Sequence, residues 1–157
     1  MPSPQVRRIL IVEDEGTLSH FLAQSFLKEA DDYEVVTVAS GEEALEALAT
    51  REFGVLITDI LLPQMSGLDL IERVRAVQPR ARIIAITAYG DDELRRRARA
   101  LGAFDFIDKP FPFHTIRDAV LRAFDAVLRA ADAADPGAPD QAPPLRQHAD
   151  AGGARQP

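Results

Sequence analysis

Apolar residues along the chain follow two alternating patterns. In the first, aliphatic residues occupy successive positions in short runs, as in strands that are buried on both faces. These runs are RRILIVED (7–14), YEVVTVA (33–39), FGVLITD (53–59), ARIIAIT (81–87) and FDFID (104–108). Five buried strands are therefore predicted.

The second pattern fills the segments after these runs, where apolar residues recur at helical spacing. Segment 17–30 places Leu18, Phe21, Leu22, Ser25 and Phe26 on one predicted stripe of a helix. Further helices are predicted at 41–50, 66–77 and 91–101 and from about 113 to 132. Each run is followed by a helix, which makes five strand–helix units.

This alternation predicts an α/β fold, a doubly wound five-stranded parallel sheet with helices on both faces. Each connection between parallel strands must cross over the sheet, and such crossovers are right-handed. Five units are too few for an eight-unit barrel, which needs about 250 residues. Local signals agree, since Gly102 suits a left-handed cap after the fourth helix and the acidic cluster 91–93 suits its beginning.

The two ends of the chain differ from the middle. We expect an N-terminal tail at 1–5, a folded domain at 6–132 and a disordered Ala/Pro-rich tail at 133–157. The last segment holds five of the eleven prolines and one large aliphatic residue, Leu145, so it cannot bury enough surface to offset its ordering entropy. It also leaves no room for a folded output domain, so a stand-alone domain is the expectation.

Composition excludes several functions. The formal net charge of −7 disfavours tight binding to nucleic acid or to an anionic membrane surface. The absence of cysteine excludes disulfides, thiol catalysis and thiolate metal sites. Only four aliphatic residues follow the basic start MPSPQVRR, too few for a signal peptide or a membrane span. A cytoplasmic location is therefore expected.

Candidate chemistry lies where the predicted strands end. Glu13 and Asp14 follow the first strand, Asp59 ends the third, Thr87 the fourth, and Lys109 follows the fifth. Ligands of open parallel sheets bind beyond the carboxyl ends of the strands, so these side chains should meet. Three acids at one place repel one another unless a cation lies among them, and Mg²⁺ suits such oxygen ligands. The lysine and the hydroxyl would complete a cradle for a phosphoryl group, with Asp59 as its nucleophile.

Each of these residues also has an ordinary explanation. An aspartate after a strand is commonly a turn former, a Glu-Asp pair can cap a helix, and Thr87 could be a routine strand residue. Four such positions at strand ends in one order favour the functional interpretation. The histidines, His20, His114 and His148, lie in helices or in the tail and offer no phosphohistidine donor.

The pieces ILIVEDE, LITDILLPQMSGLDLI, IIAITAYG and GAFDFIDKPF resemble the receiver domain of bacterial two-component response regulators. The resemblance covers about residues 6 to 130. It implies a flavodoxin-like sheet of strand order 2-1-3-4-5 with Asp59 as the phosphoryl acceptor. It also implies Mg²⁺ held by Asp14, by Asp59 and by the backbone carbonyl of Leu61, with Glu13 acting through water. Glu13 replaces the first aspartate of the more common acidic pair.

The resemblance assigns further roles. Lys109 would contact the phosphoryl oxygens, Thr87 would be the switch hydroxyl, Phe106 the aromatic switch and Pro110 a cis proline. A phosphoryl group on Asp59 would attract the Thr87 hydroxyl and vacate space into which Phe106 turns. The surface that changes would comprise the fourth helix, the fifth strand and the fifth helix.

Partners follow from the same resemblance. The phosphoryl donor would be a sensor histidine kinase or a phosphotransfer protein, and the output a downstream protein partner. A homodimer is left open. The fourth helix carries Arg95, Arg96, Arg97 and Arg99, which could face the acidic residues Asp105, Asp118 and Asp125 or be a solvated face.

Two alternatives differ in class from a signalling domain. A hydrolase with Asp59 as nucleophile would need a second acid two residues on, where the sequence has Leu61. A DNA-binding regulator is disfavoured by the acidic charge.

The bulk of Leu61 and Tyr89 beside the site predicts slow hydrolysis of the phosphorylated form. The domain should catalyse only its own phosphorylation and dephosphorylation.

Overall fold

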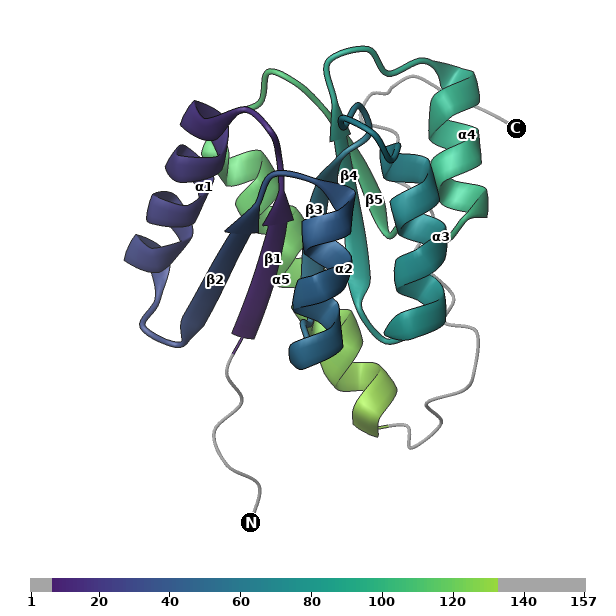
Figure 1. The fold of residues 1–157 in the computed structure, drawn as a ribbon. Helices are drawn as coiled ribbons and strands as arrows, with labels where there is room; N and C mark the ends of the chain where they lie inside the picture. The colour runs from purple at the N-terminus through teal and green to yellow at the C-terminus, as the bar shows by residue number, and fades with distance from the viewer. Residues whose placement is uncertain (1–6, 133–157) are drawn as a thin grey trace, which may run out of the picture.

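Five parallel strands form one sheet in the order β2-β1-β3-β4-β5 (Figure 1). The computed structural model describes residues 7–132, so the two predicted tails lie outside the described residues. The strands are β1 (Arg7–Val12), β2 (Tyr33–Val38), β3 (Val55–Asp59), β4 (Arg82–Thr87) and β5 (Asp105–Asp108). The helices are α1 (Gly16–Glu29), α2 (Gly41–Thr50), α3 (Gly67–Val77), α4 (Asp92–Ala100) and α5 (Phe113–Asp132). The predicted fold class and strand order are confirmed.

The strands alternate their side chains between two apolar layers, as the pleat of a strand requires. Ile9 and Ile11 of β1 face one layer, which α1 and α5 cover. Leu10 and Val12 face the other, which α2, α3 and α4 cover. In Figure 1, α2 and α3 lie in front of the sheet and α5 behind it. Because helices cover both faces, β3 and β4 are buried along their whole length and β1 is buried from Ile9 onward, which explains the aliphatic runs.

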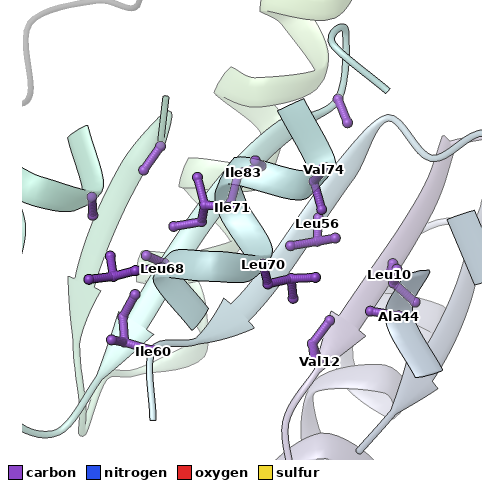
Figure 2. Close-up of a cluster of buried hydrophobic side chains, with 14 of the residues drawn as sticks. Leu10, Val12, Ala44, Leu56, Ile60, Leu68, Leu70, Ile71, Val74 and Ile83 are labelled. Carbon is purple, nitrogen blue, oxygen red and sulfur yellow. The ribbon is translucent and has the colours of Figure 1, made fainter. Parts of the chain in front are cut away.

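The layer under α2, α3 and α4 is formed mainly by aliphatic side chains. Figure 2 shows it with these residues labelled: Leu10, Val12, Ala44, Leu56, Ile60, Leu68, Leu70, Ile71, Val74 and Ile83. Full burial of one large aliphatic side chain contributes about 1.5–3 kcal/mol. Packing in this layer holds α3 against the sheet next to the loop that follows β3. It therefore also holds the backbone next to Asp59 in place.

Helix α1 differs from the prediction at one position. Leu22 and Phe26 are buried as expected, but Phe21 is 48% exposed. Its ring packs edge-on against Phe113 of α5, with centroids 6.4 Å apart. Phe21 therefore lies at the margin of the apolar stripe, where α5 covers only part of its ring.

The boundaries of α4 follow the predicted signals. The Asp91 side chain accepts a hydrogen bond from the Leu94 N–H group at 2.8 Å and so caps the first turn. Gly102 follows the helix at a φ of +113°, a conformation that favours glycine. Within residues 7–132, none of the helices combines the length and apolarity needed to cross a bilayer.

Candidate functional site

Asp59 ends β3 at the carboxyl edge of the sheet, with only 5% of its surface exposed. Its Oδ1 accepts a hydrogen bond from the Leu61 N–H group at 2.9 Å. Its Oδ2 accepts a second one from the Lys109 ammonium at 2.6 Å. The charge at the end of this apolar strand is therefore met by a cation and by a backbone donor, which offset the cost of its burial.

Glu13 approaches the same ammonium from the end of β1. Its Oε1 lies 3.0 Å from Lys109 Nζ as an ion pair, and its Oε2 accepts a hydrogen bond from the Glu15 N–H group. The side chain is almost fully buried. Burial raises the pKa of Glu13 above its usual value, nearby Asp59 adds to the rise, and Lys109 and the Glu15 N–H group oppose it. The acid is thus placed where an additional cation would favour its ionised form.

Lys109 follows β5 directly, and its peptide bond to Pro110 is cis, as predicted. Its N–H group donates a hydrogen bond to the Thr87 carbonyl at 2.8 Å, which ties the lysine to the end of β4. Burial by itself lowers the pKa of Lys109, but its contacts with Asp59 and Glu13 outweigh burial and raise it. Lys109 is therefore held in its charged form between two carboxylates from different strands.

Three carboxylates lie within reach of one metal ion. One oxygen each from Glu13, Asp14 and Asp59 lie within 4.8 Å of one another. Mg²⁺ binds oxygen ligands at 2.0–2.1 Å in an octahedron, so such oxygens need only small shifts to share an ion. Glu13 Oε1, which is buried, makes no hydrogen bond although it faces Lys109. The donor set, with a buried oxygen that has no partner among the described residues beyond its ion pair with Lys109, fits a hard divalent cation.

Thr87 and Phe106 lie on neighbouring strands beside this cluster. The Thr87 side chain is buried, and its Oγ1 accepts a hydrogen bond from the Tyr89 N–H group at 3.2 Å. The ring of Phe106 is also buried, at 2% exposure. The resemblance implies that Phe106 turns inward on phosphorylation, whereas in the structure its ring already occupies a buried position.

The structure thus brings together four predicted residues, Glu13, Asp14, Asp59 and Lys109. Thr87 is linked to them by the hydrogen bond between its carbonyl and the Lys109 N–H group. Leu61 takes part through its N–H group; its carbonyl as a metal ligand stays a prediction. His20 and His114 are exposed, and His148 lies outside the described residues.

The three acids that the sequence offered as possible partners of the α4 arginines pair with other residues. Asp105 is buried and pairs with Arg122 of α5 at 2.8 Å. Asp118 pairs with Arg117, and Asp125 with Arg129, so both acids have partners on their own helix. Arg95 instead pairs with Asp108, a partner that was not predicted.

Two glycines of the site were not predicted. A Cβ atom at Gly67 would lie 2.4 Å from the carbonyl oxygen of Asp59. At Gly90 it would lie 2.5 Å from Asp108 Oδ1 and 2.9 Å from Phe106 Cε1. Close approach of two backbones is one general reason for glycine, but no periodicity reveals which element will approach. The only sequence signal was their position shortly after two predicted strands.

These features define a class of protein: a flavodoxin-like α/β domain with an acidic, lysine-bearing site at the carboxyl edge of its sheet. The chain matches the family model of the response regulator receiver domain over residues 9–121. It is 32% identical over 113 residues to sporulation initiation phosphotransferase F of Bacillus subtilis, covering 72% of this chain and 90% of that protein. The chain therefore belongs to the response regulator receiver domain family.

Solved structures agree. A CheY-like response regulator receiver domain protein of Methanospirillum hungatei matches with a TM-score of 0.76 and 27% identity over 80% of this chain and 98% of that chain. The receiver domain dimer of NtrC4, in its beryllofluoride-activated form, matches with a TM-score of 0.72 and 26% identity, covering 77% and 98%. Seven further curated relatives are longer proteins, of which this chain spans 24–58%.

Proposed function

We propose that Asp59 accepts a phosphoryl group from a phosphohistidine of a sensor histidine kinase or a phosphotransfer protein. The observation that carries this proposal is the position of Lys109, whose ammonium contacts both Asp59 and Glu13 inside a cluster of three carboxylates. An ordinary buried ion pair needs one carboxylate. A second acid on the same ammonium, with a third acid close to both carboxylates, suits a site that also receives a metal ion and phosphoryl oxygens.

The transfer needs one nucleophile and a neutralised anion. A carboxylate oxygen of Asp59 attacks phosphorus and forms an O–P bond, while the N–P bond to the donor imidazole breaks and the imidazole takes up a proton. Lys109 Nζ lies 2.6 Å from Asp59 Oδ2, so it can donate hydrogen bonds to the phosphoryl oxygens as negative charge develops on them. The Leu61 N–H group holds the other carboxylate oxygen and orients the side chain.

Glu13, Asp14 and Asp59 would hold Mg²⁺, and the backbone carbonyl of Leu61 would join them. When bound, the ion offsets the repulsion among these acids and the incoming phosphoryl oxygens. The raised pKa of Glu13 fits this role, because a group that is costly to ionise gains most from a nearby cation.

The output would be a change at the surface formed by α4, β5 and α5. In the phosphorylated form the Thr87 hydroxyl would turn toward the group on Asp59, and a buried Phe106 would fill the space beside it. The name of the Bacillus subtilis relative, a phosphotransferase, supports a role in phosphoryl transfer. A downstream protein partner would read this surface, and the activated NtrC4 dimer supports self-association as one form of readout.

We further propose that the domain catalyses only its own phosphorylation and dephosphorylation. A hydrolase that used Asp59 would need an acid two residues on to protonate a leaving group. Leu61 occupies that position with an exposed, uncharged side chain. The aspartyl phosphate is then a signal rather than an intermediate of turnover.

The experiment is intact-mass spectrometry after incubation with acetyl phosphate, with and without Mg²⁺. We expect one phosphoryl adduct on the wild type with Mg²⁺, and none on Asp59→Asn or in the presence of excess EDTA. Asp69→Asn removes an exposed acid of α3 and should be labelled like the wild type. Equal labelling of Asp59→Asn and the wild type would exclude Asp59 as the acceptor.

A further inference from the structure

Arg95 of α4 contacts two residues of β5 at once. Its guanidinium carbon lies 4.9 Å from the ring centroid of Phe106, within the range of a cation–π interaction. The same guanidinium forms an ion pair with Asp108 Oδ2. Phe106 and Asp108 are two residues apart on one strand, so they share a face of the sheet. One side chain from α4 therefore clamps two neighbouring positions on that face.

Gly90, in the loop before α4, borders the same space. A Cβ atom there would lie 2.5 Å from Asp108 Oδ1, 2.9 Å from Phe106 Cε1 and 3.2 Å from Thr87 Cγ2. The bare backbone of Gly90 thus leaves just enough room for these three side chains. The Phe106 ring thus has both Arg95 and the backbone of Gly90 close to it, and the methyl group of Thr87 borders the same glycine.

The other arginines of α4 do not make such a contact. Arg96 pairs with Glu93 of its own helix, which links α4 to nothing else. Arg97 and Arg99 are exposed. Arg95 is only partly exposed and connects the helix to the strand that leads into Lys109. A solvated helix face therefore does not describe Arg95.

We propose that Arg95 is a positioning residue of the switch: held by Asp108, it keeps Phe106 buried beside Thr87 and thereby favours the arrangement that binds a phosphoryl group. This inference rests on the proposed function of Asp59. None of the clamp contacts involves Asp59, so they can stabilise the buried ring without a phosphoryl group. By linkage, whatever favours the binding-competent arrangement also raises the apparent affinity for the ligand that selects it.

The test uses the full chain labelled with fluorinated phenylalanine, with Mg²⁺ and beryllofluoride as the phosphoryl probe. The ¹⁹F resonance of Phe106 is assigned from its loss in Phe106→Leu. Without the probe, Arg95→Gln and Asp108→Asn should each increase the solvent exposure of the Phe106 ring, measured through this resonance. Each should also weaken beryllofluoride binding by about fivefold, the size expected for one partly exposed cation–π contact with one exposed ion pair.

Matched variants separate the clamp from general effects of charge or folding. Arg97→Gln removes an exposed arginine of the same helix and should change neither readout. Arg95→Lys keeps a cation for the ring and the carboxylate and should restore most of the affinity. The double variant Arg95→Gln, Asp108→Asn should bind little worse than either single variant, because both remove one interaction.

Two results would overturn the inference. One is a Phe106 resonance in Arg95→Gln that is as protected as in the wild type. The other is an unchanged or tighter affinity for beryllofluoride. Failure of the wild type to bind beryllofluoride would instead count against the proposed function, and the ¹⁹F exposure measured without the probe would still decide whether Arg95 holds the ring.

Discussion

The backbone of Asp59 lies directly against Gly67: a Cβ atom at position 67 would be 2.4 Å from the Asp59 carbonyl oxygen and 2.6 Å from the Ile60 Cα atom. The Gly67 N–H group also donates a hydrogen bond to the Ile60 carbonyl at 2.8 Å. The first residue of α3 therefore sets the course of the chain just after β3. We therefore expect the orientation of the Asp59 carboxylate to depend on this contact.

We expect Gly67→Ala to lower the free energy of unfolding by about 1–3 kcal/mol, because the added methyl group meets backbone atoms that cannot rotate away. Labelling by acetyl phosphate should slow by about tenfold or more, since a small displacement of Asp59 misaligns its attack. Chemical denaturation and the time course of intact mass measure the two effects.

Gly16→Ala is the matched control, because Gly16 is also the first residue of a helix and nothing lies within 4 Å of the added Cβ atom. It should leave both the stability and the labelling rate near the wild-type values. If Gly67→Ala behaved like Gly16→Ala, the contact with Asp59 would not position the carboxylate.

Removal of the Lys109 ammonium should separate stability from chemistry. In metal-free buffer Lys109→Ala leaves two buried carboxylates facing each other, a loss of about 3 kcal/mol in the free energy of unfolding. Mg²⁺ should restore much of this stability, because it also neutralises the acids. The labelling rate should stay about 10²-fold below that of the wild type, because the phosphoryl oxygens lack their donor.

The control is Lys28→Ala, which removes the only other lysine of the chain, an exposed residue near the end of α1. It should change neither quantity. A Lys109→Ala variant that is labelled at the wild-type rate with Mg²⁺ would show that the ammonium serves folding alone.

The sequence predicted the strands and the acidic edge for one physical reason. A sheet covered on both faces requires continuous aliphatic runs, and parallel strands bring their carboxyl ends to one edge. Asp59 and Lys109 are therefore brought to the same edge by the parallel strands, although 50 positions separate them along the chain.

Contacts that depend on how a helix sits against the sheet were not predictable in this way. Asp105 was one possible partner of the α4 arginines in the sequence, but it is buried and pairs with Arg122 of α5. Arg95 was one of four similar arginines in the sequence, and only the packing of α4 places it over Phe106. The same holds for Gly67, whose importance depends on the backbone of another element.

The titration of Glu13 gives a prediction about pH. Because burial raises its pKa in the folded protein, the folded state holds the Glu13 proton more tightly than the unfolded state does. The stabilising contribution of protonated Glu13 is fully present below the unfolded value of about 4.5 and is lost as the pH rises through the raised folded value. Glutamine, which does not ionise, avoids this loss.

In metal-free buffer we therefore expect Glu13→Gln to unfold at a higher temperature than the wild type at pH 7.5 and at a similar temperature near pH 4. Mg²⁺ at pH 7.5 should stabilise the wild type more than the variant and so reduce the difference between their unfolding temperatures. Differential scanning calorimetry over this pH range measures both. A gap that is constant from pH 4 to 7.5 would contradict a raised pKa of Glu13.

The lifetime of the aspartyl phosphate should depend on two exposed side chains at the rim of the site. Leu61 is 53% and Tyr89 74% exposed, and their N–H groups bind Asp59 Oδ1 and Thr87 Oγ1. Both side chains thus project from backbone that is anchored to the site. Hydrolysis requires a water molecule to reach the phosphorus atom, and we expect the bulk of these two side chains to hinder its approach.

We expect the double variant Leu61→Asn, Tyr89→Ser to lose its phosphoryl group about tenfold faster, a change of about 1.4 kcal/mol in the barrier. The decay of the adduct is followed by intact mass after the acetyl phosphate is removed. Val77→Asn, which replaces another exposed apolar side chain at the end of α3, should decay like the wild type. Because all three side chains are exposed, stability should change by no more than about 0.5 kcal/mol. A double variant that decays no faster than the wild type would show that these side chains do not control the access of water.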